Sequence, residues 1–201
     1  MTLNKVCYFL LFCVSIPFLC SCTSERGVVA KAPVSIKKDS DYFPAFKRWK
    51  KDMAVYKDLE LVFRGYVVLL SPQMQQACEN RIQTVEGPTG HLDKHLVGTD
   101  QTISVLVSAF AISQAFRELD DGKTWAMALF VDGQWIASDS VYHYRTTGNL
   151  LSCFPQGSPW DEMYAVTFHT PQKSSPDASQ KPVRFALKSG AAQTEFSWDI
   201  N

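Results

Sequence analysis

The sequence predicts a mainly β protein with peripheral helices, an α+β fold in which an antiparallel β-sandwich carries N-terminal helices packed on or beside it. Short runs rich in β-branched and aromatic residues recur from residue 59 onward, and turn residues separate them. Helix-like patterns lie mainly in the N-terminal half and do not alternate regularly with the strands. A doubly wound parallel sheet needs that alternation, so we expect antiparallel strands joined by hairpins.

The first residues of the chain have the pattern of a signal peptide. Lys5 is the one basic residue before an apolar run over residues 6–19, which Ser15 interrupts. A charged start followed by such a run is typical of secretory signals, and the run is too short to cross roughly 30 Å of hydrocarbon as a helix. We therefore expect residues 1–21 to be a signal peptide that is removed.

The end of this run, Leu19-Cys20-Ser21-Cys22, resembles the lipobox of bacterial lipoproteins, with a leucine three residues before a cysteine and a small residue directly before it. The resemblance implies cleavage after Ser21, diacylglycerol on the Cys22 thiol and acylation of the new N-terminus with a fatty acid such as palmitate. Cys20 fits the pattern poorly, because Leu19 stands where the small residue belongs.

That resemblance also implies an address. The protein is expected to be lipid-anchored in the bacterial cell envelope, with each buried CH₂ of its acyl chains contributing about 0.8 kcal/mol to membrane binding. Thr23 follows the lipidated cysteine in place of the aspartate that signals inner-membrane retention. In a host with two membranes we therefore expect the outer membrane, with the protein facing the periplasm.

Charge is balanced over the whole chain but unevenly distributed. The chain has 20 Lys and Arg and 20 Asp and Glu, a balance that argues against a nucleic-acid partner. Residues 22–58 carry nine basic and five acidic side chains, whereas residues 59–201 carry ten and fifteen. The net positive charge of residues 22–58 favours contact with an anionic lipid surface. A solvated tether and helix face would have the same composition, so both interpretations stay open.

After the lipobox, residues 22–40 show no periodicity and are expected to form a flexible tether, followed by a single globular domain over residues 41–201. We predict a helix over residues 41–58, preceded by polar residues that can cap it. Its apolar residues share one face: Phe46, Trp49, Met53 and Tyr56. A face of this kind packs on the domain or lies on a membrane, and we expect packing on the domain.

A β-rich run over residues 59–70 has Gly65 in its middle, where we expect a bulge or a close backbone contact. Ser71-Pro72 then predicts the start of a helix over residues 71–86, with serine at the N-cap and proline in the first turn. Cys78 lies on the apolar side of that helix, so we expect it to be buried.

The remaining pattern indicates strands and hairpins, with one or two helical turns over residues 91–97 and a short helix or turn over 149–154. Residues 99–113 are apolar on both parities, which predicts a central strand. Asp132-Gly133 predicts a type I′ hairpin. Its arms are residues 124–131 and 134–145; a strand over 162–168, a loop over 171–182 and a hairpin about Ser189-Gly190 complete the chain.

Two cysteines remain after the signal peptide and the lipidated Cys22 are set aside. Cys78 lies on a helix and Cys153 in or beside a short turn far along the chain, and nothing in the sequence brings these elements together. An oxidising envelope compartment permits pairing, but burial alone accounts for Cys78. We therefore predict two separate, unpaired cysteines.

His91 and His95 are four residues apart with Asp93 between them, a spacing that places both imidazoles on one face of a helix. Zinc normally needs a third protein ligand, and none is identifiable, so we expect solvent-facing histidines in a loop and no metal. His143 and Arg145 share one face of a strand. They fit an anion site or the polar outer face of an edge strand.

Nucleophile patterns are weak. Ser158 is not in a Gly-x-Ser-x-Gly turn and precedes a proline, which removes a backbone donor. Cys153 is the one candidate thiol, and no His–Asp pair can be assigned to it. The acidic pairs Asp120-Asp121 and Asp161-Glu162 fit solvated loops. We predict no catalytic, cofactor-binding or metal-binding residues and no cofactor, with Cys22 as the lipid-attachment site.

The element order, ending in a hairpin with Trp198, also resembles uncharacterised bacterial envelope lipoproteins with a β-sandwich domain, a resemblance that implies no activity. We expect a non-catalytic binding or structural module, held to the membrane by acyl chains on Cys22 and acting on a protein partner in the envelope. Two alternatives stay open. One is a carrier of a lipid or small ligand, and the other is an envelope hydrolase that uses Cys153 or His143.

Overall fold

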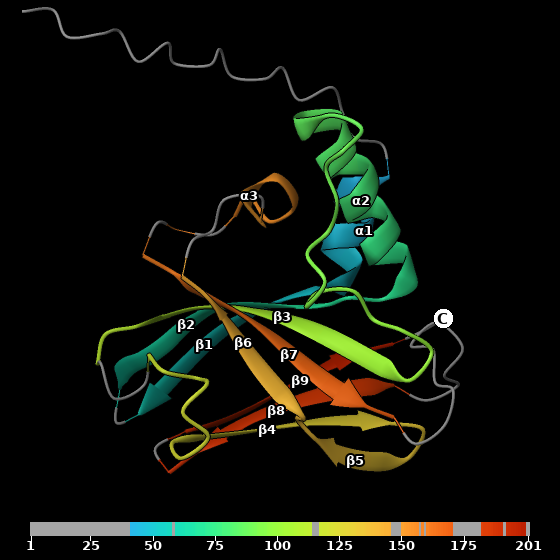
Figure 1. Ribbon diagram of the computed structural model, residues 1–201. Coiled ribbons are helices and arrows are strands. Elements are labelled where there is room, and N and C mark those ends of the chain that lie inside the picture. The colour runs from blue at the N-terminus through green and yellow to red at the C-terminus, as the bar shows by residue number, and fades with distance from the viewer. Residues whose placement is uncertain are drawn as a thin grey trace, which may run out of the picture. The chain divides into compact units, whose positions relative to one another are not determined.

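Five strands form one antiparallel sheet and four strands form a second one in the computed structural model of the chain (Figure 1). The structure describes residues 41–57, 59–113, 117–145, 150–156, 158, 160–170, 182–190 and 192–199. The predicted signal peptide and tether, and the lipobox with Cys22, lie outside these residues, as does nearly all of the predicted loop over residues 171–182.

Each sheet is fully antiparallel. The first has the order β1 (Lys50–Lys57), β2 (Glu60–Leu69), β3 (Thr102–Ala111), β7 (Glu162–His169) and β6 (Ser140–Tyr144). The second has the order β5 (Gln134–Ala137), β4 (Trp125–Val131), β8 (Val183–Ser189) and β9 (Gln193–Trp198). The predicted fold class, mainly β in antiparallel sheets with few helices, is confirmed.

Large side chains fill the space between the two sheets. The Phe63 ring of β2 lies 5.5 Å from the Trp125 ring of β4, and the Phe168 ring of β7 lies 6.1 Å from the Phe185 ring of β8. Burial of such rings is the main source of stability in a β-sandwich. These contacts join both sheets into one core.

Three helices gather over the outer face of the five-stranded sheet, α1 (Tyr42–Trp49), α2 (Pro72–Glu86) and α3 (Leu150–Cys153) (Figure 1). The Phe46 ring of α1 lies 6.1 Å from that of Tyr66 on β2. Because helices cover one face and the second sheet the other, every residue from 103 to 109 of β3 is buried. The predicted central strand is confirmed.

The helix predicted over residues 41–58 is wrong in its second half. It ends at Trp49, and residues 50–57 form β1, which pairs along β2. Met53 and Val55 are buried in alternation with exposed neighbours, whereas Tyr56 is 63% exposed. The apolar residues are spaced by three, four and three positions, which fits a helix locally. The edge of β2 offers backbone hydrogen-bond partners to residues 50–57, and this pairing outweighs the local helical preference. The aromatic face of α1 packs on the domain, as we expected.

The predicted elements over residues 59–86 are confirmed. The Ser71 hydroxyl accepts a hydrogen bond from the Met74 backbone N–H (3.2 Å), with Pro72 in the first turn of α2. Gly65 makes the expected close contact, since a Cβ there would lie 1.9 Å from the Ser108 carbonyl oxygen of β3.

Residues 91–97 form a turn in place of the helical turns that we predicted. The Asp93 carboxylate accepts a hydrogen bond from the His95 backbone N–H (2.9 Å), and the Asp93 carbonyl accepts one from the Leu96 N–H (2.9 Å). An aspartate side chain that bonds to the backbone two residues on favours a turn over a helix, because it satisfies the N–H locally.

The Asp132-Gly133 hairpin is confirmed as type I′, because both residues have positive φ, 52° and 91°. The strand predicted over residues 134–145 is divided. β5 ends at Ala137 and β6 begins at Ser140 in the other sheet. The Ser138 N–H donates to Met127 of β4 (3.0 Å), and the Asp139 N–H donates to Thr167 of β7 (2.9 Å). The chain therefore crosses between the sheets at these two residues.

The later elements follow the prediction. α3 forms within residues 149–154, β7 covers the strand predicted over 162–168, and β8 and β9 form the hairpin about Ser189-Gly190.

The prediction of two unpaired cysteines is wrong. Cys78 of α2 and Cys153 of α3 form a disulfide, with their Cα atoms 5.2 Å apart. The helices are also joined by hydrogen bonds from the Arg81 guanidinium to the Ser152 carbonyl (2.6 Å) and from the Ser152 hydroxyl to Glu86 (2.6 Å). The two cysteines are 75 positions apart, so their contact is tertiary, and the sequence of neither helix predicts it.

Candidate functional site

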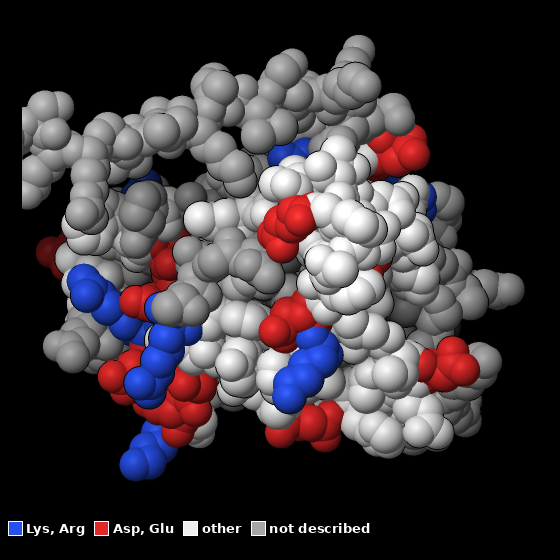
Figure 2. All heavy atoms as spheres, turned by 45° about the horizontal axis from the view of Figure 1, so that its top comes forward, with Lys and Arg blue, Asp and Glu red and all other residues white. Residues whose placement is uncertain are grey.

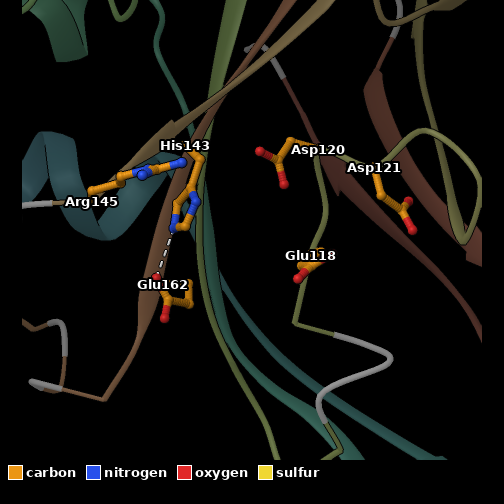
Figure 3. Close-up of a pocket in the computed structure, with 6 residues that line it drawn as sticks. All are labelled: Glu118, Asp120, Asp121, His143, Arg145 and Glu162. Carbon is orange, nitrogen blue, oxygen red and sulfur yellow. Dashed lines mark hydrogen bonds and ion pairs between the residues drawn. The ribbon is translucent and has the colours of Figure 1, made fainter.

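An open recess of about 540 Å³ lies beside the edge strand β6. Its polar lining comes from β6 and the residue after it, from the first residue of β7 and from the segment that leads into β4. Figure 3 shows these side chains, which are Glu118, Asp120, Asp121, His143, Arg145 and Glu162. The volume is in the range of small-ligand sites.

Side chains alternate along β6, and His143 is the β6 residue that lines the recess. The His143 ring stacks on the Tyr164 ring of β7, with centroids 4.6 Å apart. Its neighbours face the other way, since Tyr142 stacks on His95 (3.9 Å) and the Tyr144 hydroxyl donates to Asp93 (2.9 Å). The predicted separation of histidine and tyrosines onto two faces of an edge strand is confirmed.

His143 has a carboxylate partner that the sequence did not indicate. Its Nε2 lies 2.7 Å from a carboxylate oxygen of Glu162, which is the dashed contact in Figure 3. Asp161, the preceding residue, accepts hydrogen bonds from the Ser108 hydroxyl (3.2 Å) and the Ser158 N–H (3.0 Å). Our assignment of Asp161-Glu162 to loop solvation is therefore wrong. The Asp161 carboxylate accepts hydrogen bonds from Ser108 and Ser158, and the Glu162 carboxylate contacts His143.

The opposite wall begins at Arg117, which is fixed to the sheet. The Tyr164 hydroxyl donates a hydrogen bond to the Arg117 carbonyl, and the Arg117 guanidinium donates to the Ala111 carbonyl at the end of β3 (2.9 Å). Burial raises the pKa of the Tyr164 hydroxyl, so it stays protonated and donating. The ring that supports His143 therefore also positions this wall.

Asp121 serves the turn that enters β4. Its carboxylate accepts hydrogen bonds from the Thr124 N–H (2.9 Å), the Thr124 hydroxyl (2.7 Å) and the Lys123 N–H (2.9 Å), and these donors, Thr124 first, lower its pKa. In Figure 3 the Asp121 carboxylate points away from the His143–Glu162 pair. Its role is structural.

Glu118 and Asp120 remain as carboxylates without a hydrogen bond or ion pair among the residues that the structure describes. Figure 3 shows them on the side of the recess that faces His143 and Glu162. Leu119 between them is fully buried, whereas Glu118 and Asp120 are both exposed. An acid-leucine-acid alternation was the signal in the sequence that could have found this wall, and our prediction missed it.

The electrostatics favour a cationic ligand. Four carboxylates line the recess against the guanidinium of Arg145. The anion site that His143 and Arg145 suggest in the sequence is therefore disfavoured here, because an incoming anion would meet excess negative charge. On the face in Figure 2, acidic and basic side chains are interspersed among uncharged ones.

The other predicted candidates lie apart from the recess. His91 contacts the Glu79 carboxylate (2.8 Å), which also accepts the Leu92 N–H (2.8 Å); these hydrogen bonds, that of His91 first, lower the pKa of Glu79. His95 stacks on Tyr142, so the two histidines have separate partners. Within the described ranges, no group of three or more His, Cys, Asp or Glu is placed to hold a metal ion.

Both candidate nucleophiles are engaged. Cys153 is part of the disulfide, so it has no free thiol to act as the nucleophile of a hydrolase. The Ser158 hydroxyl accepts the Trp160 N–H (3.1 Å) within a turn.

No protein-family model, curated protein or solved structure matches this chain. None of the helices in the described ranges has the length and apolar composition that a membrane span requires.

Proposed function

We propose that this chain is a lipid-anchored protein of the bacterial cell envelope and a non-catalytic binding module for a protein partner. In this proposal the recess receives a basic side chain of the partner. The observation that carries it is the pair of carboxylates, Glu118 and Asp120, which face the His143–Glu162 pair without a cationic partner of their own in the described structure. The lipobox-like sequence supports both the lipid anchor and the location in the cell envelope.

The geometry supports binding of a cation in three ways. The wall that holds Glu118 and Asp120 is fixed through Arg117 and Tyr164, so the carboxylates are held in place before a ligand arrives. Glu162 contributes a third carboxylate, already oriented by His143. The recess opens beside β6, whose outer edge is paired with no other strand in the described part of the chain, so a partner chain can approach it there.

The anchor is tested by replacing Cys22. Intact mass of the wild-type protein should show loss of residues 1–21 and the added mass of acyl chains. Cys22→Ser should release soluble protein or leave an uncleaved precursor, because the acceptor thiol is gone. In a host with two membranes, density gradients should place the wild type with outer-membrane markers. Unchanged processing and membrane fractionation of Cys22→Ser would contradict the lipid anchor.

The binding site is tested by photo-cross-linking in cells that make the full chain. A photoreactive amino acid at position 145, which lines the recess but supplies none of its carboxylates, should give a defined protein adduct. The same amino acid at Ser197, exposed on β9, should not. Adding Glu118→Gln to the position-145 probe should reduce the adduct roughly 10-fold, because a charge-assisted hydrogen bond is lost. An equal yield with Glu118→Gln, or an equal yield from position 197, would contradict the proposed site.

A further inference from the structure

The backbone of β6 has an open edge beside the recess. β6 pairs with β7 on one side, and within the ranges that the structure describes no strand pairs with its other side. In an antiparallel ladder, every second residue of a strand directs its N–H and C=O groups toward one neighbour, and the residues between direct theirs to the opposite side. The register of β6 therefore decides which backbone groups its outer edge offers to a partner.

The outward groups of β6 belong to Val141 and His143. The Asp139 N–H donates to the Thr167 carbonyl (2.9 Å), so the backbone groups of Thr167 on β7 point toward β6. Thr167 is paired with Ser140, so the backbone groups of Ser140 point toward β7. Alternation gives the opposite direction to Val141 and His143, whose N–H and C=O groups point away from β7.

A strand added at this edge would place a side chain in the recess. Paired residues of neighbouring strands carry their side chains on the same face of a sheet. His143 lines the recess, so a partner residue paired with His143 presents its side chain on the recess face. Four carboxylates against the single guanidinium of Arg145 favour a lysine or arginine in that place.

The opposite face of β6 is aromatic. The Tyr142 residue is 43% exposed, and its ring stacks on the His95 ring (3.9 Å) and contacts the Tyr144 ring edge-on (4.9 Å). Side chains that flank the basic residue of an added strand would lie on this face. We therefore expect them to be apolar or aromatic, because they would cover part of the exposed ring.

We propose that the partner binds by strand addition. An extended segment pairs along the outer edge of β6, bonds to the backbone of Val141 and His143, and places a Lys or Arg side chain in the recess. Backbone hydrogen bonds supply affinity in this mode of binding, and the alternate side chains supply specificity. This inference rests on the proposed function, which it extends from a basic side chain to the backbone that carries it.

The charge of the recess also selects between two kinds of strand. A second copy of this chain could offer its own β6, but pairing β6 with β6 would bring two recesses with excess negative charge side by side. A basic segment of another protein neutralises that charge. The added strand is therefore assigned to a different protein.

The test uses cells that make the full chain with the photoreactive amino acid at position 145. Val141→Pro removes an outward N–H, and an edge strand tolerates proline where the N–H faces solvent. It should reduce the adduct roughly 10-fold, because a backbone hydrogen bond is lost. Ser197→Pro on the edge strand β9 is the matched control and should leave the adduct unchanged. The Ser189 N–H donates to the Ala192 carbonyl (2.7 Å), and this register directs the Ser197 N–H away from β8.

A probe at position 142 supplies a second measurement that leaves the backbone of β6 intact. Benzoylphenylalanine at this position keeps an aromatic ring on the face opposite His143. An added strand has side chains on both faces, so positions 142 and 145 should label the same partner. Digestion and mass spectrometry should place both cross-links in one segment that contains Lys or Arg.

The outcomes separate this inference from the proposed function. A position-145 adduct that Val141→Pro leaves unchanged, or that has no counterpart at position 142, would overturn strand addition and keep the recess as a binding site. Cross-links to a second copy of this chain would overturn the assignment to a different protein. If the wild type with the position-145 probe gives no adduct, the proposed function fails and the inference fails with it.

Discussion

Removing the Cys78–Cys153 disulfide is expected to lower the free energy of unfolding by about 4 kcal/mol, because the bridge closes a long loop in the unfolded chain. The two cysteines are separated by 75 positions, and both are fully buried between α2 and α3. Urea unfolding of Cys78→Ala/Cys153→Ala should therefore show a lower midpoint than the oxidised wild type.

A reducing agent supplies the control for this prediction. It should lower the midpoint of the wild type but leave that of Cys78→Ala/Cys153→Ala unchanged. The effect should be greatest locally, because α3 is a single short helix held by the bridge and by the Arg81 contact to the Ser152 carbonyl. Two free thiols in the denatured, unreduced protein would contradict the pairing itself.

Gly65→Ala is expected to destabilise the domain by roughly 3 kcal/mol or more, or to prevent folding, because the added methyl group overpacks the centre of a sheet. Its Cβ would lie 1.9 Å from the Ser108 carbonyl oxygen. That carbonyl belongs to β3, which is paired on both sides, so it cannot move without breaking pairing with β2 or β7. Circular dichroism during thermal unfolding measures the loss.

Gly190→Ala is the matched control. A Cβ at Gly190 would meet no atom within 4 Å, so this variant should unfold within about 0.5 kcal/mol of the wild type. Equal stability of Gly65→Ala and Gly190→Ala would show that β2 and β3 approach less closely than the structure has them.

Several of the observed features are encoded by a few neighbouring residues. Ser71-Pro72 begins a helix because the serine oxygen accepts a backbone N–H and the proline needs none. Asp132-Gly133 forms a type I′ turn because both residues tolerate positive φ. Apolar residues on both parities placed β3 at the centre, and the lack of regular alternation led to the antiparallel fold class. Each of these depends on local chemistry or on composition.

The candidate site was predictable only in part. Alternation along β6 placed His143 and Arg145 on one face, and the structure agrees. The sequence did not place Glu118 and Asp120 opposite them, because those acids follow a different strand and reach the recess through the Arg117 contact to Tyr164. The resulting balance of charge, which favours a cation, exists only once the two walls meet.

Three other features depend on contacts between separate elements of the fold. Residues 50–57 became a strand because β2 offered an unpaired edge, the arm over 134–145 divided because Ser138 and Asp139 bond to different sheets, and Cys78 met Cys153 because α2 packs on α3. In each case the deciding contact joins two separate elements, from the hairpin partners Lys57 and Glu60 to Cys78 and Cys153, which lie 75 positions apart. Its free energy appears only when both partners are in place, so no local pattern carries it.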